Sequence, residues 1–185
     1  MRLRFISVML TLFSCLSANA QKISISTNIL DYAALGTLNA EASVALSRHW
    51  SLVAGAKYNP FTFNKSDVEK QFQYRQQTYS LGVRVWPWHI WTGWWFSSGL
   101  RYQEYNVGGL FSRDVREGDR FGVGFYSGYT HMLSTHFNLE LGLGLWTGWD
   151  MYTRYDCPSC GLTSDAGGKV FLLPDELKIS IAYVF

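Results

Sequence analysis

The chain ends on Lys178-Ile179-Ser180-Ile181-Ala182-Tyr183-Val184-Phe185, which alternates strictly between large apolar residues and small or polar ones. Successive side chains of a β-strand point to opposite faces. One face of this segment therefore carries Ile179, Ile181, Tyr183 and Phe185, and the other carries Lys178, Ser180, Ala182 and Val184. This division is typical of a strand that lies between lipid and a narrow polar lumen, although a soluble edge strand is an alternative.

The first twenty residues have the three parts of a secretory signal peptide. Arg2 and Arg4 form a basic start, residues 5–16 are mostly apolar, and residues 18–20 are small. A transmembrane anchor is one alternative, but the apolar run is shorter than the ~20 residues of a membrane-spanning helix. A lipoprotein site at Cys15 is a second alternative. We expect residues 1–20 to be a cleaved signal peptide and residues 21–185 to form a single domain.

The charge balance and the aromatic content narrow the range of functions that the sequence allows. Removal of Arg2 and Arg4 leaves fourteen basic residues, which equals the number of acidic residues. This balance does not indicate an electrostatic nucleic-acid binder, so we expect no nucleic-acid partner. The eight Trp, eleven Tyr and twelve Phe residues are typical of aromatic girdles at a membrane interface. We predict that the tryptophans, which fall near the ends of predicted strands, form two interfacial belts: Trp50, Trp86, Trp88, Trp91, Trp94, Trp95, Trp146 and Trp149.

Alternation with period two recurs along the whole chain. It is found at about residues 23–29, 38–46, 50–59, 78–85, 96–102, 121–126, 137–145 and 178–185. The connections after the second, fourth and sixth segments are short (47–49, 86–93 and 130–136), whereas 60–77, 103–120 and 147–177 are long and polar. Short periplasmic turns and longer external loops give this pattern when both termini are periplasmic.

We therefore predict an all-β fold, an eight-stranded antiparallel up-and-down transmembrane β-barrel in the outer membrane of a Gram-negative bacterium, with lipid around it. A soluble periplasmic ligand-binding barrel, with its apolar side chains inside, has the same periodicity and is the alternative.

Four segments resemble a Bacteroidetes family of small outer-membrane β-barrel proteins of unknown function. They are residues 27–31 (TNILD), 58–63 (YNPFTF), 105–109 (YNVGG) and 155–161 (YDCPSCG). The last strand, which ends on Phe185, also resembles the C-terminal signal by which the barrel-insertion machinery recognises outer-membrane barrels. The resemblance implies a location and a fold, and it supplies no catalytic residues.

Five charged residues share the inward parity of their predicted strands: Glu41, Lys57, Arg84, Arg101 and Glu140. An eight-stranded barrel is just wide enough for side chains to fill, and a buried charge left alone is costly. We therefore expect these residues to form a salt-bridged polar network that plugs the lumen. A gated path for protons or ions is the alternative.

Cys157 and Cys160 are the two cysteines outside the predicted signal peptide. In an exported protein we expect them to form a disulfide at the tip of the longest loop. A metal site would need about two further ligands, and the four histidines map to the opposite end of the barrel. A redox pair would need a thioredoxin-like βαβ pattern, which the sequence lacks. We expect no bound metal and no cofactor.

No serine of the predicted external loops is paired with a histidine base, so we expect no catalytic residue and no enzyme activity. The sequence predicts a non-enzymatic outer-membrane barrel with a structural or surface-interaction role, whose external loops contact a partner that the sequence does not name. A small pore or transporter and an accessory to surface-appendage assembly are the alternatives.

Overall fold

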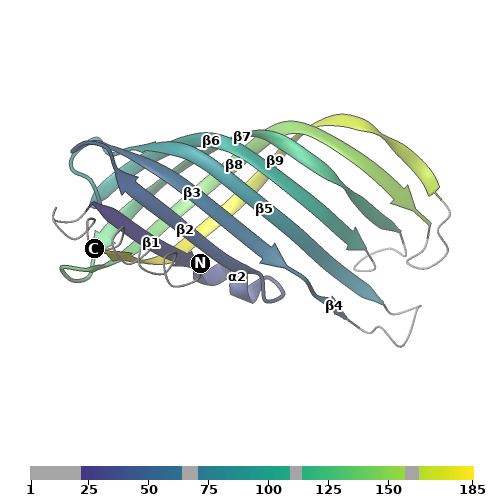
Figure 1. The fold of residues 1–185 in the computed structure, drawn as a ribbon, viewed down its shortest axis with the longest axis horizontal. Helices are drawn as coiled ribbons and strands as arrows, with labels where there is room; N and C mark the ends of the chain where they lie inside the picture. Colours follow the sequence, from purple (N-terminus) through teal and green to yellow (C-terminus); the bar gives the residue numbers. More distant parts are fainter. Residues whose placement is uncertain (1–21, 64–70, 109–113, 157–162) are drawn as a thin grey trace, which may run out of the picture.

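The computed structural model describes residues 22–63, 71–108, 114–156 and 163–185 (Figure 1). These residues form an antiparallel β structure with one short helix, α2 (Ile29–Ala33), so the all-β prediction is confirmed. Within the described ranges, no helix is both long and apolar enough to cross a membrane. The strands are β1 (Ile23–Asn28), β2 (Leu38–Ala45), β3 (Trp50–Asn59), β4 (Thr62–Phe63), β5 (Phe72–Val85), β6 (Gly93–Gly108), β7 (Val115–Met132), β8 (Phe137–Tyr155) and β9 (Thr163–Val184).

The nine strands are arranged as a ring, in which β4 follows β3 along the same edge of β5, so eight strands enclose the interior. They pair in the order β3-β2-β1-β9-β8-β7-β6-β5-β4, and an additional pairing of β3 with β5 closes the sheet. The two ways of relating β1 to β9 show that the ring is staggered. Ser24 on β1 pairs directly with Val184 on β9. When each residue is followed to its partner on the next strand, from Ser24 through β2, β3, β5, β6, β7 and β8, the path instead reaches Leu173 on β9. A stagger of this kind accompanies strands that tilt by about 35–45° from the axis of a closed sheet. The predicted count of eight omitted β4, which adds two residues beside the start of β5.

The start of β1 and the end of β9 meet at one end of the ring, where the N–H of Phe185 donates to the C=O of Ile23 at 2.9 Å. This end, termed the terminal end, carries the connections 46–49, 86–92 and 133–136. At the opposite end, termed the far end, β5 to β9 continue as a curved sheet beyond β1, β2 and β3 (Figure 1).

The predicted long loops are wrong over most of their length. Residues 72–77, 103–108, 115–120, 147–155 and 163–177 belong to strands. Both faces of the curved far sheet carry polar residues, so no strict apolar alternation marks these segments in the sequence. The structure therefore replaces loops with long strand extensions.

The alternation read from the last strand is confirmed, because Lys178, Ser180, Ala182 and Val184 are all buried. The outward side chains remain exposed, as with Leu143 at 64 % on β8. Among the described residues, seventeen polar or charged residues are buried against eleven apolar ones. The distribution is the reverse of the usual water-soluble core.

A small apolar cluster closes the terminal end. It consists of Trp86, Ile90, Trp91, Trp95 and Val184. The connection 86–92 lies against the sheet here, where the indole N–H of Trp86 donates to Ser51 Oγ at 3.2 Å and Asn138 Nδ2 donates to the C=O of Trp91 at 3.0 Å. These contacts place the cluster inside the ring.

The prediction that all eight tryptophans lie at an interface is wrong for four of them. Trp86, Trp91, Trp95 and Trp146 are buried, each at most 3 % exposed. Proximity to a turn was a poor guide, because Trp95 and Trp146 share the inward parity of their strands and the connection that carries Trp86 and Trp91 packs inward. The exposed members are Trp50, Trp88, Trp94 and Trp149.

Candidate functional site

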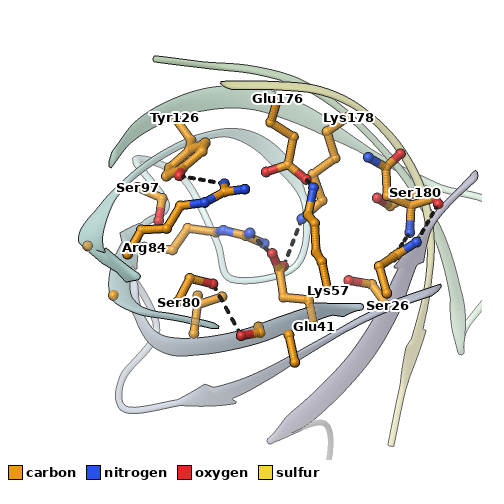
Figure 2. Close-up of a pocket in the computed structure, with 18 of the residues that line it drawn as sticks. Ser26, Glu41, Lys57, Ser80, Arg84, Ser97, Tyr126, Glu176, Lys178 and Ser180 are labelled. Carbon is orange, nitrogen blue, oxygen red and sulfur yellow. Dashed lines mark hydrogen bonds and ion pairs between the residues drawn. The ribbon is translucent and has the colours of Figure 1, made fainter. Parts of the chain in front are cut away.

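Four charged residues from four strands meet inside the ring and form a central charge cluster, of which Glu41, Arg84 and Lys178 are labelled in Figure 2. Arg84 Nη2 lies 2.7 Å from Glu41 Oε1, and Arg84 Nη1 lies 3.4 Å from Glu140 Oε2. Lys178 Nζ lies 2.7 Å from Glu41 Oε1 and 3.1 Å from Glu140 Oε2. Each cation thus contacts both carboxylates, and the two positive and two negative charges balance.

The indole of Trp95 lies beside this central charge cluster. Its ring centroid is 4.3 Å from Arg84 Cζ and 5.6 Å from Lys178 Nζ, which allows cation–π attraction to both cations. Space for the indole comes from Gly128 on β7 and Gly142 on β8, where an added Cβ would overlap it. The glycines at inward positions of these strands therefore make room for a large aromatic side chain.

A second group of charges lies next to the central cluster. Lys57 Nζ lies 2.8 Å from Asp31 Oδ2 on α2 and 3.1 Å from Glu176 Oε1 on β9. Asp31 is near the start of α2, where the Asn28 side chain caps the helix by accepting the N–H of Leu30. The short helix after β1 thus carries a carboxylate to the inner lysine.

Asp175 reaches the interior because β9 contains a β-bulge. Glu176 pairs with Gly144 and Pro174 pairs with Leu145, so Asp175 has no opposite residue on β8. Proline cannot donate to the ladder, which explains an irregularity at this position. The Asp175 carboxylate forms an ion pair with Arg101, and it accepts a hydrogen bond from Tyr126 Oη at 2.8 Å.

A third group lies toward the far end and centres on Asp150, which is 1 % exposed. Asp150 Oδ2 lies 3.3 Å from Arg120 Nε and 4.0 Å from Lys169 Nζ, and Oδ1 accepts from Tyr105 Oη at 2.8 Å. The Arg120 guanidinium also lies 4.0 Å from the centroid of the Tyr105 ring. One carboxylate is therefore shared by two cations.

The five residues predicted to face the lumen, Glu41, Lys57, Arg84, Arg101 and Glu140, all face the interior and all form ion pairs. Sequence reasoning missed several of their partners. Lys178 and Glu176 share the inward parity of the last strand, which was a usable signal. The bulge conceals the facing of Asp175, and Asp31 lies outside any alternating segment.

A cavity of about 60 Å³ remains among these side chains, with Ser26, Ser80, Ser97 and Ser180 on its wall (Figure 2). A space of this size holds a few water molecules that can bond to the polar groups around it. Among the described residues, no group of three or more His, Cys, Asp or Glu is placed to hold a metal ion. Cys157 and Cys160 lie outside the described residues.

The far end carries a second, open hollow of about 650 Å³ whose wall includes Tyr105, Glu117 and Tyr152. Tyr155 Oη donates to Glu117 Oε1 at 2.6 Å, and this hydrogen bond raises the pKa of the Tyr155 phenol. Tyr152 Oη bonds to Asp165 Oδ2 at 3.0 Å, which raises the pKa of Tyr152 in the same way. The far end thus presents aromatic and charged groups around a polar recess.

Comparison with known proteins gives one result. The model of a family described as "Protein of unknown function (DUF3575)" matches residues 6–185 of the chain. No curated protein and no solved structure matches it.

Proposed function

The chain therefore belongs to the DUF3575 family, a family of unknown function, and we propose that it is an outer-membrane β-barrel with a plugged lumen and a surface-interaction role. The observation that carries this proposal is the reversed distribution of side chains. Leu143, Leu145 and Leu177 are each at least 54 % exposed, while Arg84, Glu140 and Lys178 are each at most 5 % exposed. Hydrocarbon around the ring would cover the first set, and closed pairing leaves no strand edge for lipid to solvate within the ring.

Aromatic residues support the placement of the membrane boundaries. Tyr79, Tyr102, Phe121 and Trp149 lie in register on four neighbouring strands and are all exposed. Toward the terminal end, Trp94 pairs with Tyr129, and the centroids of their rings are 5.4 Å apart. Trp94 and Tyr102 are eight residues apart on β6, which on a strand of normal rise and tilt corresponds to a height of about 20 Å. An outer-membrane barrel has an apolar band of similar height between two aromatic girdles.

A soluble periplasmic barrel is disfavoured by the same geometry. A soluble ligand-binding barrel would hold its apolar side chains in the lumen. Here the lumen contains ion pairs, and the outer surface would expose a continuous apolar area to water.

The filled lumen favours a structural or surface-interaction role over a pore. The ion pairs on Arg84, Arg101 and Lys57 occupy the interior, and the apolar cluster around Trp86 closes the terminal end. An eight-stranded barrel offers little space beyond what such side chains fill. Surface contact would then use the far end, where the open hollow lies. A small transporter and an accessory to surface-appendage assembly are the competing roles.

Several further features belong to this proposal. Residues 1–20 act as a cleaved signal peptide, and the barrel-insertion machinery recognises the strand that ends on Phe185. The terminal end faces the periplasm, because it carries the short connections, and the far end faces outward. The protein acts without catalytic residues or a cofactor, in the outer membrane of a Gram-negative bacterium, with Bacteroidetes as the expected source.

The test is outer-membrane fractionation followed by gel electrophoresis with and without boiling. We expect the protein in the outer-membrane fraction, with a band that changes mobility on boiling because a closed barrel resists detergent until heated. A protein that fractionates with soluble periplasmic proteins and shows no mobility change would overturn the proposal. Steady open channels in a planar lipid bilayer would favour the pore instead.

A further inference from the structure

β9 is the longest strand of the sheet, and most of one of its edges has no main-chain partner in the part of the chain that the structure describes. β1 pairs with β9 only from Ser180 to Val184. The Asn28 side chain ends this ladder, because its Oδ1 accepts the N–H of Ile179 at 3.0 Å and its Nδ2 donates to the C=O of Leu177 at 3.2 Å. Among the described residues, the segment 163–176 then pairs only with β8, and Asp175 at the bulge has no opposite residue there.

Every second residue directs its main-chain groups to this open edge. The outward-facing Leu177 presents its C=O to the β1 side, whereas the inward-facing Phe171 presents its C=O to Thr147 Oγ1 on β8 at 2.8 Å. Along an antiparallel strand, residues whose side chains face outward direct their main-chain groups to one edge, and residues whose side chains face inward direct theirs to the other edge. Val170 and Leu172 face outward like Leu177, so their N–H and C=O groups point to the open edge.

The surface beside this edge is exposed and partly apolar. Residues 163–170 are all exposed, and the exposed fractions of Val170 and Leu172 reach 69 % and 68 %. Proteins usually protect an edge by keeping it short, charged or covered. This edge is long, and at Val170 and Leu172 it offers apolar side chains next to main-chain groups that have no partner in the described part of the chain.

We propose that this open edge of β9 is a docking site for an extended segment of a partner protein, which adds to the sheet as a further antiparallel strand. The proposal rests on the proposed function, because an outward far end makes the edge reachable from outside the cell. Strand addition gives affinity through main-chain hydrogen bonds and specificity through alternate side chains. Pro174, which has no N–H, marks the end of the edge available for pairing.

The charges near the edge indicate what the partner segment carries. The Lys169 side chain is 49 % exposed, and its carboxylate neighbour Asp150 is shared with Arg120. A carboxylate on the docked strand beside Lys169 would balance the remaining positive charge. On the opposite face, apolar residues of the segment would cover Val170 and Leu172. The partner is thus an extended segment with apolar residues on one face and an acidic residue on the other.

A second copy of this chain is a weaker candidate. Antiparallel self-pairing about Gly167 would set Asp165 of one copy opposite Lys169 of the other. The two-fold axis of such a pair stands perpendicular to the sheet, so one copy would be inverted relative to the other. Two barrels inserted into one membrane share one orientation, and the edge therefore remains free for a different chain.

The test uses the full-length protein in detergent and a short synthetic peptide of alternating valine and threonine with one central glutamate. Amide hydrogen exchange is followed in residues 163–173 with and without the peptide. We expect the peptide to slow exchange at every second amide by at least tenfold. The same peptide with N-methyl groups on alternate amides, which cannot complete the ladder, should lose this effect.

Two variants test the edge itself. Val170→Pro removes an N–H from the open edge and should weaken peptide binding at least tenfold, whereas Val170→Ala keeps the N–H and should bind within about threefold of the parent. Protection outside residues 163–173, undiminished binding of the methylated peptide, or no binding at all overturns the proposal. Protection that grows with protein concentration in the absence of peptide also overturns it, because the occupant would be a second copy. A heat-dependent mobility shift of the same preparation reports on the barrel independently of these outcomes.

Discussion

Lys178 Nζ lies 2.7 Å from Glu41 Oε1, and this contact joins the last strand to the second strand across the interior of the ring. The two residues are separated by most of the chain, and β1 lies between their strands in the sheet. The contact is one of four that link Arg84 and Lys178 to Glu41 and Glu140. Removal of one member therefore leaves an unbalanced charge in the interior.

Glu140→Ala should destabilise the protein strongly. Glu140 is 2 % exposed and faces both Arg84 and Lys178, so its loss leaves excess positive charge in the interior. Breaking a buried pair in this way costs about 3–5 kcal/mol. The measurement is the urea midpoint for unfolding from lipid vesicles, with the exposed Glu104→Ala as the control, which should change stability by less than about 0.5 kcal/mol. Equal midpoints for Glu140→Ala and the parent would show that the cluster contributes nothing.

A double substitution separates lost charge balance from lost packing. Glu140→Leu combined with Lys178→Met removes one charge of each sign and keeps side chains of similar volume. Replacing a buried ion pair by apolar residues is often neutral or stabilising, so the double variant should recover most of the stability lost in Glu140→Ala. A double variant as unstable as Glu140→Ala would argue that geometry, and not charge balance, sets the cost.

Gly128→Ala should weaken folding, because an added Cβ would lie closest to the C=O of Leu141 and would also meet the indole of Trp95. A Cβ at Gly128 would overlap the Trp95 ring, which itself lies against Arg84. Overpacking of this kind costs about 1–3 kcal/mol. The control is Gly167→Ala on β9, where the nearest atom to an added Cβ is Tyr152 Oη at 3.7 Å. Thermal or urea unfolding of both variants tests the prediction, and equal effects would refute it.

Leu143→Arg tests the proposed lipid face. Leu143 is 64 % exposed and lies outward on β8, between the aromatic rows. An arginine near the middle of the bilayer costs about 2–4 kcal/mol in an outer-membrane barrel, and far less near the interface. Thr153→Arg, outward on the same strand but beyond Trp149, is the matched control. In lipid vesicles we expect only Leu143→Arg to lower the urea midpoint, and a water-exposed face would tolerate both variants equally.

The parent protein should show no steady conductance in a planar lipid bilayer, because ion pairs and the terminal apolar cluster fill the interior. Glu41→Ala should clearly lower the free energy of unfolding and should change the conductance little. Both quantities are measured on one preparation, with protein-free bilayers as the control. Regular open channels in the parent would contradict a plugged lumen and would favour a role as a pore.

The local sequence pattern was sufficient to predict those strands that have one exposed apolar face and one face packed in the interior. The segment 178–185 alternates because one face is apolar and the other is packed inside, and that contrast is visible in one dimension. For the same reason, the inward positions of Glu41, Lys57, Arg84, Arg101 and Glu140 could be predicted from parity alone. The far extensions of β5 to β9 could not, because polar residues occupy both of their faces.

The partners of the predicted charges depended on three-dimensional relationships. A single bulge beside Pro174 turns Asp175 toward Arg101, and a helix of five residues carries Asp31 to Lys57. The burial of Trp86 and Trp91 likewise follows from a connection that packs into the terminal end. None of these relationships has a fixed spacing in the sequence, since each depends on where separate strands meet.

The sequence by itself thus determined the antiparallel all-β class, the two faces of its clearest strands and the five charges that turn inward, because strand geometry links side-chain direction to position. Only the tertiary structure decided the closure of the ring, the pairing of the charges, the burial of four tryptophans and the open edge of β9. Those features arise from register, bulges and strand ends, which are set by contacts between residues far apart in the chain.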